Sequence, residues 1–278
     1  MPRLIDDLTD VTPLSAGGQK EVYKARHPQH GIVVLKRIKP KSPTIDVERT
    51  RREIRAVEKI RSEHVPRIYE HNLDDANAES LYLIEQYVDA PTLRTLISEG
   101  TTFSTKDVIL FLETFLSVCA VAEEQRIVHR DIKPENILVE EGPKYWALDF
   151  GISRHLDLES ITATNAPFGL FTVGYASSEQ FRNIKREIDV RADLFSIGVV
   201  ATEMLSGINP YIAGETDALT VLRKIERSPV PLCSIEGDTQ YQLATFIRIL
   251  GDNRKSRRPR TAAEAKAILT AAKATVRY

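Results

Sequence analysis

A change from strand-like to helical patterning near Pro91 constrains the fold more than any other feature of the sequence. Before it, three segments rich in β-branched and aromatic residues, 21–26, 32–38 and 81–88, are expected to form strands. Segment 46–61 differs, because its apolar residues recur at helical spacing among many charges. The first third of the chain is therefore predicted to be a β-rich unit with one helix.

After Pro91 the pattern becomes helical. Four segments are predicted as helices: 104–125, 192–205, 241–250 and 261–272. The first opens with a capping-type Ser-Thr-Lys-Asp sequence, and the second is apolar nearly all round, which indicates a buried helix. Together the patterns predict an α+β fold of two lobes. The small β-rich N-lobe is expected over residues 1–88 and the larger α-helical C-lobe over 89–278.

Composition excludes several other classes of protein. The 278 residues include 38 Lys and Arg against 39 Asp and Glu, so the formal net charge is −1. This balance gives no reason to expect a nucleic-acid or membrane partner, and four exposed basic residues of the cluster at 254–260 are expected to be solvated. The apolar runs at 108–122 and 194–205 are interrupted and fall short of the about 20 residues that a membrane helix needs.

Two cysteines, Cys119 and Cys233, lie far apart in the sequence, which fits neither a disulfide framework nor a metal-ligand spacing. Both are expected to be small buried apolar residues in a reducing compartment. Residues 1–7 carry acidic side chains where a secretory signal would carry basic ones. We therefore predict a cytoplasmic protein.

The most informative stretch, residues 129–136, reads His-Arg-Asp-Ile-Lys-Pro-Glu-Asn, and Asp-Phe-Gly follows it at 149–151. In this order the two motifs resemble those of the eukaryotic-type protein kinases. Phosphoryl transfer requires a few charges held in fixed positions around a triphosphate and its magnesium. The resemblance implies that Asp131 accepts the proton of the substrate hydroxyl, that Lys133 neutralises the moving γ-phosphate, and that Asn136 and Asp149 hold Mg²⁺.

Lys133 also bears on the substrate class, because in this family a lysine at this position is typical of the serine/threonine-specific branch. A competing interpretation of the residues is that Asp131 and Asn136 merely order a loop and that Asp149 caps a turn. The order and spacing of the two motifs favour the catalytic interpretation.

An upstream Val-Val-Leu-Lys sequence ends at Lys36 and resembles the family's strand motif, whose lysine contacts the α- and β-phosphates. Glu53, on the predicted helix at 46–61, is placed to be its ion-pair partner. Glu48 and Glu58 are alternative partners. Taken singly, a lysine in a strand and a glutamate on a charged helix are ordinary surface residues, so the pairing depends on order and spacing.

The expected nucleotide-covering loop departs from the family's Gly-x-Gly-x-x-Gly-x-Val pattern. Between Leu14 and Val22, both expected to contact nucleotide, only Gly17 of the three glycines is in register. Gly18 would help to keep the hairpin tip open to phosphate, and Lys20 would add a charge facing it. A plain hairpin turn with a solvated Lys20 is the alternative.

The segment between the lobes is a second departure. Alignment with the family's hinge places Gln86 and Val88 where backbone groups bind adenine, and it places Glu85 at the gate to the rear pocket. That position usually holds an apolar or small polar residue, because a buried carboxylate is costly unless it is paired. A shift of one residue, which moves Glu85 into the hinge, is the alternative.

The segment after 151 resembles an activation loop. The family's Ala-Pro-Glu is here Ser-Ser-Glu ending at Glu179, for which Arg258 is the expected partner. Thr172 matches the threonine that reaches the catalytic Asp and Lys, and Asp193 matches the aspartate that anchors the catalytic loop, with a helix N-cap as the alternative. Arg130 resembles an arginine that clamps a phosphorylated loop. The candidate phosphate carriers are Ser153, Ser160, Thr162 and Thr164.

The resemblance runs from about Leu14 to Ala272. It implies a protein kinase that transfers the γ-phosphate of ATP to Ser or Thr of protein substrates, uses Mg²⁺ and autophosphorylates its activation loop. A nucleotide-binding scaffold with a kinase fold is the alternative, which the degraded glycine loop and Glu85 favour and the full set of key polar residues opposes. A small-molecule phosphotransferase is disfavoured, because Lys133 and Glu179 suit a protein acceptor. Regulation is expected from a partner protein or from the loop itself.

Overall fold

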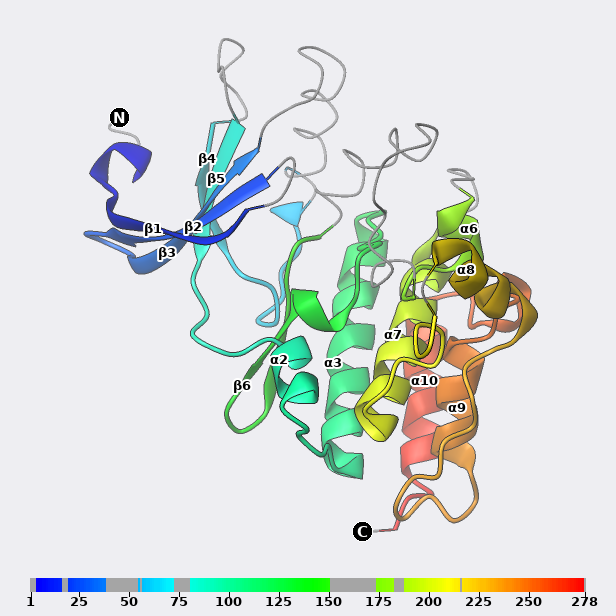
Figure 1. The fold of residues 1–278 in the computed structure, drawn as a ribbon. Helices are drawn as coiled ribbons and strands as arrows, with labels where there is room; N and C mark the ends of the chain where they lie inside the picture. The colour runs from blue at the N-terminus through cyan, green and yellow to red at the C-terminus, as the bar shows by residue number, and fades with distance from the viewer. Residues whose placement is uncertain are drawn as a thin grey trace.

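A computed structural model describes residues 4–16, 20–38, 55, 57–72, 81–150, 174–182, 188–215 and 217–277. Over these ranges the chain forms a β-sheet lobe followed by a larger helical lobe (Figure 1). The predicted two-lobed α+β architecture is confirmed. The predicted boundary after residue 88 falls in the connection between strand β5 and helix α2. None of the helices in these ranges combines the length and the apolar character that a bilayer-spanning segment requires.

The N-terminal lobe is an antiparallel sheet with the strand order β1-β2-β3-β5-β4. Its strands are β1 (Thr9–Ala16), β2 (Lys20–His27), β3 (Gly31–Ile38), β4 (Ile68–His71) and β5 (Leu81–Gln86), preceded by the turn η1 (Leu4–Asp7). The sequence patterns predicted β2, β3 and β5. They missed the two edge strands, because β1 is polar and carries Pro13, and β4 has only four residues. The helix predicted at 46–61 lies almost wholly outside the described residues, although Arg55 and Val57 are helical.

The C-terminal lobe is mainly helical. Its helices are α2 (Leu93–Ser98), α3 (Thr105–Glu124), α6 (Ser178–Phe181), α7 (Val190–Ser206), α8 (Ala218–Arg227), α9 (Gln242–Leu250) and α10 (Ala262–Lys273). Short elements complete it: η2 (Pro134–Asn136), β6 (Ile137–Glu140), β7 (Lys144–Ala147) and η5 (Lys255–Arg257). The four predicted helices correspond to α3, α7, α9 and α10 within two residues at each end. The β6–β7 hairpin, which joins the two predicted motifs, was not expected.

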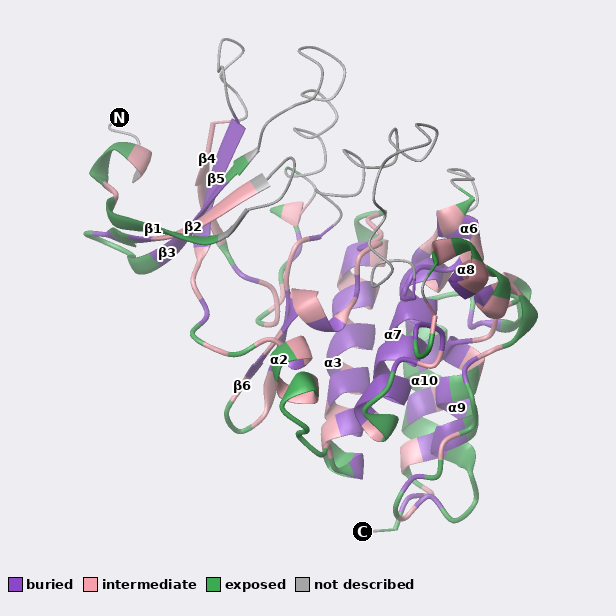
Figure 2. Cartoon of the chain, viewed as in Figure 1, coloured by how far each residue is buried: buried purple, intermediate pink, exposed green. Residues whose placement is uncertain are grey.

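Helices α3 and α7 form the centre of the helical core (Figure 2). The predicted capping box starts α3, because the Ser104 hydroxyl accepts from the Asp107 N–H at 3.2 Å and the Asp107 carboxylate accepts from the Ser104 N–H at 2.8 Å. Cys119 on α3 is buried as predicted, but Cys233 is only half-buried. The burial prediction was wrong for Cys233 because it lies in the irregular segment between α8 and α9, at the edge of the core.

Gly198 allows α7 to approach Gly251 at the end of α9. A Cβ at position 198 would lie 2.5 Å from the Gly251 nitrogen. We expect Gly198→Ala to lower the free energy of unfolding by about 3 kcal/mol, because the overpacked helices must move apart. Urea denaturation measures the change. The control Gly214→Ala, whose Cβ would meet nothing within 4 Å, should lose only about 1 kcal/mol from its positive φ. Equal losses in both variants would contradict the packing argument.

Candidate active site

The loop at 129–136, which carries the predicted catalytic residues and is called the catalytic loop below, is anchored to helix α7 through the buried side chain of Asp193. Its two carboxylate oxygens accept hydrogen bonds from the backbone N–H groups of His129 and Arg130, each at 2.7 Å. Burial raises the pKa of Asp193, an effect that His129, Arg130 and these two bonds oppose. The predicted anchoring role is confirmed. The N-cap alternative is wrong, because Asp189 caps α7.

Two side chains orient the Asp131 carboxylate. The Asn136 amide nitrogen donates to Asp131 Oδ2 at 2.7 Å and to the Asp131 backbone oxygen at 2.9 Å. Lys133 Nζ lies 3.0 Å from the same Oδ2. The turn η2, which Pro134 begins, places these residues directly before strand β6. The predicted catalytic residues therefore meet at one carboxylate.

The two motifs of the sequence also touch each other. The rings of His129 and Phe150 lie with their centroids 4.4 Å apart, and the Leu148 N–H donates to the Asn136 backbone oxygen at 2.9 Å. Burial lowers the pKa of His129 although nearby carboxylates oppose it, so the ring is neutral at pH 7. Asp149 is consequently delivered to the same cleft as the catalytic loop.

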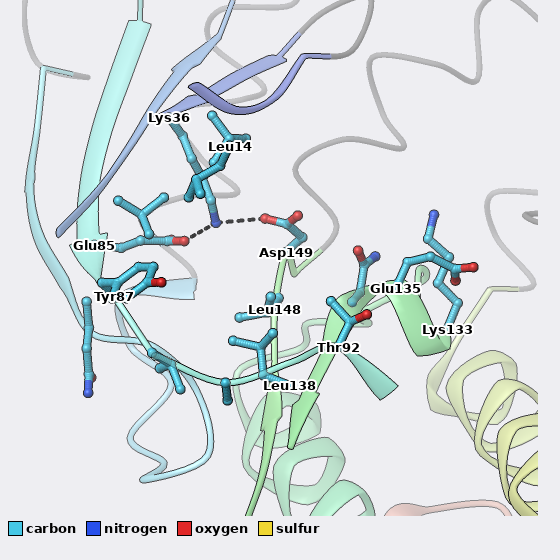
Figure 3. A pocket seen from close by; sticks show the side chains of 16 residues that line it. Leu14, Lys36, Glu85, Tyr87, Thr92, Lys133, Glu135, Leu138, Leu148 and Asp149 are labelled. Carbon is cyan, nitrogen blue, oxygen red and sulfur yellow. Dashed lines mark hydrogen bonds and ion pairs between the residues drawn. The ribbon is translucent and has the colours of Figure 1, made fainter. Parts of the chain in front are cut away.

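Lys36 lies between two carboxylates at the back of this cleft (Figure 3). Its Nζ is 2.7 Å from Asp149 Oδ1 and also forms an ion pair with Glu85 Oε1. Burial alone would favour the neutral amine, but Asp149 and Glu85 outweigh burial, and the pKa of Lys36 is raised. Glu85 belongs to β5 and is buried. These contacts favour the gate position for Glu85 over the shift into the hinge.

A cavity of about 690 Å³ opens in front of Lys36. Its lining includes residues predicted to contact nucleotide or metal: Leu14, Val22, Lys36, Gln86, Val88, Lys133, Asn136 and Asp149. In Figure 3, Leu14 lies above the cavity and Leu138 and Leu148 lie below it. A flat apolar group would fit between these side chains, with the hinge at its edge. The sequence analysis did not single out Leu138 and Leu148, although each lies within two residues of a predicted metal ligand.

Several predicted residues lie outside the described part of the chain. They are Gly17, Gly18, Glu48, Glu53, Thr172 and the four candidate phosphorylation sites at 153, 160, 162 and 164. Lys20 begins strand β2, but the position of its side chain is not described. Among the alternatives for the helix partner of Lys36, Glu58 lies 3.1 Å from His71 Nε2. The Lys36–Glu53 pair therefore stays a prediction.

The predicted pair of Glu179 and Arg258 is confirmed. Arg258 Nη1 lies 2.7 Å from Glu179 Oε1, and both side chains are buried. The residue after Glu179 links this pair to the catalytic loop, because Gln180 Nε2 donates to the Arg130 backbone oxygen at 2.9 Å. Helix α6 is therefore connected to both the catalytic loop and the end of the helical core.

A network around Arg94 on α2 was not predicted from the sequence. The guanidinium donates to Glu135 Oε1 and to Glu203 Oε1, each at 2.8 Å, and to the Tyr175 hydroxyl. Burial opposes the charge on Arg94, but these partners outweigh it and raise the pKa of Arg94. The network joins α2, η2, α7 and the segment before α6. A single arginine on a short helix carries no sequence signal for such a role.

We expect Asp193→Asn to lower kcat by about 10²-fold, because an amide NH₂ would face a backbone N–H donor and displace the catalytic loop. Steady-state kinetics together with a melting temperature separates this effect from unfolding. Asp189→Asn on the same helix is the control, since Asn is as good an N-cap as Asp. Wild-type kcat in the Asp193 variant would contradict the anchoring role.

A buried lysine, the carboxylate paired with it and a second, oriented carboxylate lie around a cleft between a sheet lobe and a helical lobe, which is the arrangement of a two-lobed phosphotransferase. Comparison with known proteins identifies the family within this class. The protein kinase domain family model matches residues 8–268, and the chain belongs to the protein kinase family. The family predicted from the two motifs is therefore confirmed.

Several curated relatives match most of the chain. The probable serine/threonine-protein kinase PknB of Bifidobacterium longum is 30% identical over 253 residues, which cover 88% of this chain and 36% of the relative. The serine/threonine-protein kinase PknB of Mycobacterium leprae is 29% identical over 277 residues, 96% of this chain and 43% of the relative. A probable serine/threonine-protein kinase of Clostridium acetobutylicum is 31% identical over 237 residues, 84% and 35% respectively. The chain spans less than half the length of these relatives.

Proposed function

We propose that the chain is an active serine/threonine protein kinase, which transfers the γ-phosphate of ATP to Ser and Thr hydroxyls of protein substrates. The main support for this proposal is that the side chains of Asn136 and Lys133 both contact the Asp131 carboxylate. A pocket that only binds nucleotide requires Lys36. It does not require an oriented carboxylate such as that of Asp131, which is not among the residues that line the cavity. Lys133 and the names of the relatives support the Ser/Thr specificity.

In the proposed reaction, Asp131 takes the proton of the substrate hydroxyl as the hydroxyl oxygen bonds to the γ-phosphorus of ATP. The bond between the γ-phosphorus and the β–γ bridging oxygen breaks, and ADP leaves. The two hydrogen bonds from Asn136 hold the Asp131 carboxylate in one orientation. Lys133 carries positive charge beside this carboxylate and stabilises the charge on the phosphoryl group in flight. Lys36 binds the α- and β-phosphates from the other side of the cavity.

Asn136 and Asp149 are the proposed ligands of Mg²⁺. Both line the cavity and offer oxygen atoms, the ligand type that Mg²⁺ prefers. The Asn136 amide nitrogen donates to Asp131, so its carbonyl oxygen is the proposed metal ligand. In the described ranges no cluster of three or more His, Cys, Asp or Glu could hold a metal, and Mg²⁺ sites commonly combine one or two protein ligands with phosphates. When bound, Mg²⁺ neutralises charge on the β- and γ-phosphates.

We also propose a boundary between the lobes, the contacts with adenine, the mode of regulation and the location of the protein. We place the division between the lobes after Val88, with backbone groups of Gln86 and Val88 binding adenine. A partner protein or autophosphorylation within 151–173 would regulate the kinase. A reducing cytoplasm is the proposed location, supported by two cysteines that are both free thiols.

The test is incubation of the purified chain with Mg²⁺, labelled ATP and a generic basic protein, followed by mass spectrometry of the protein and of residues 149–180. We expect phosphoserine or phosphothreonine, and we expect EDTA to abolish it. ATP binding without any transfer would contradict the proposal and favour the nucleotide-binding scaffold.

A further inference from the structure

Glu85 and Lys36 are paired by the register of the sheet. Strands β3 and β5 are antiparallel neighbours, with Val34 opposite Glu85 and Lys36 opposite Leu83. Lys36 and Glu85 are therefore diagonal neighbours on one face, a separation that long side chains can bridge. Their ion pair links two adjacent strands of the same sheet.

Burial makes this ion pair difficult to break. Lys36 is 6% exposed and Glu85 is 8% exposed. A buried carboxylate that loses its cation is strongly destabilised. The other charged side chains that line the cavity are Asp149, Lys133 and Glu135, and of these only Asp149 forms an ion pair with Lys36. Lys36 would therefore keep its ion pair with Glu85 even when the Asp149 carboxylate binds Mg²⁺ instead of Lys36.

An ammonium group has three hydrogen-bond donors, so Lys36 can keep its ion pair with Glu85 while it binds phosphate. The long lysine side chain otherwise loses rotamer entropy when a ligand immobilises it. A carboxylate that already holds Nζ at the back of the cavity removes part of this cost before the nucleotide arrives. Glu85 therefore contributes to phosphate binding through Lys36.

We propose that Glu85 is a positioning residue that orients Lys36 toward the phosphates of the nucleotide from within the sheet. This inference rests on the proposed function in that Lys36 is taken to bind phosphate. It gives a role to a residue whose type departs from the family at this position.

The test is a double-mutant cycle on nucleotide binding, which requires no phosphoryl transfer. Calorimetry measures Kd for Mg-ATP and for adenosine in wild type, Glu85→Leu, Lys36→Met and the double variant. The preference for Mg-ATP is the ratio of Kd for adenosine to Kd for Mg-ATP. We expect Glu85→Leu to lower this ratio about tenfold and to leave Kd for adenosine within twofold of wild type. In the Lys36→Met background the same change should have no further effect, because Glu85 acts through Lys36.

Glu70→Gln on the neighbouring strand β4 is the matched control and should keep the wild-type preference. An unchanged preference in Glu85→Leu, or an equal loss in the Lys36→Met background, would overturn the inference. If Lys36→Met fails to fold, the comparison of Glu85→Leu with Glu70→Gln still decides. The transfer assay on wild type tests the proposed function separately, so the two failures are distinguishable.

Discussion

Asp131→Asn should lower kcat by about 10³-fold and leave the affinity for ATP within a few-fold of wild type. An amide oxygen can still accept the hydrogen bond that Asn136 donates at 2.7 Å, so the loop keeps its shape. The amide cannot take a proton from the substrate hydroxyl. Asp131 is also not among the residues that line the nucleotide cavity, which explains why binding should survive.

The measurement is steady-state kinetics with Mg-ATP and a protein substrate, alongside calorimetry of ATP binding. Asp217→Asn is the matched control, because Asp217 is an exposed N-cap of α8 and Asn caps helices equally well. Wild-type turnover in Asp131→Asn would show that another group accepts the proton. An equal loss in both variants would show that the effect is not specific to the catalytic loop.

How well the sequence predicts each helix or strand depends on how strong the pattern of residues within that element is. Helices α3, α7, α9 and α10 have apolar residues at helical spacing, and the sequence alone placed their ends within two residues. Strands β1 and β4 are polar or short edge strands, and backbone pairing with a neighbour holds them in place. Such pairing depends on tertiary contact, which a single-sequence pattern does not reveal.

The site could be predicted in part for the same reason. The motif residues around Asp131 lie close together in the sequence, and η2 and the β6–β7 hairpin bring them together in space. The cost of a buried carboxylate at Glu85 was anticipated, but its pairing with Lys36 depends on the register of β3 against β5. The contacts of Arg94 join four separate elements, and no spacing in the sequence encodes them.

Arg258→Ala should lower the free energy of unfolding by about 3–5 kcal/mol. The guanidinium is fully buried and donates to Glu179 Oε1 at 2.7 Å, to the Asp252 backbone oxygen at 2.7 Å and to the Arg191 backbone oxygen at 2.9 Å. Alanine would leave a buried carboxylate and two backbone carbonyl groups without this donor. It would also remove the stacking of Arg258 over the Phe195 ring, at 4.9 Å from its centroid.

Urea denaturation of Arg258→Ala beside Arg257→Ala separates this effect from a loss of charge. Arg257 is the adjacent residue, but its side chain is 57% exposed and its contact with Asp252 is 4.0 Å long, so its removal should cost less than about 1 kcal/mol. Arg258→Lys should fall between the two, because an ammonium restores the charge but not the planar arrangement of donors. Similar losses at positions 257 and 258 would contradict a structural role for the buried pair. A large loss at 258 alone would show that the buried contacts of Arg258, the pair with Glu179 among them, stabilise the helical core.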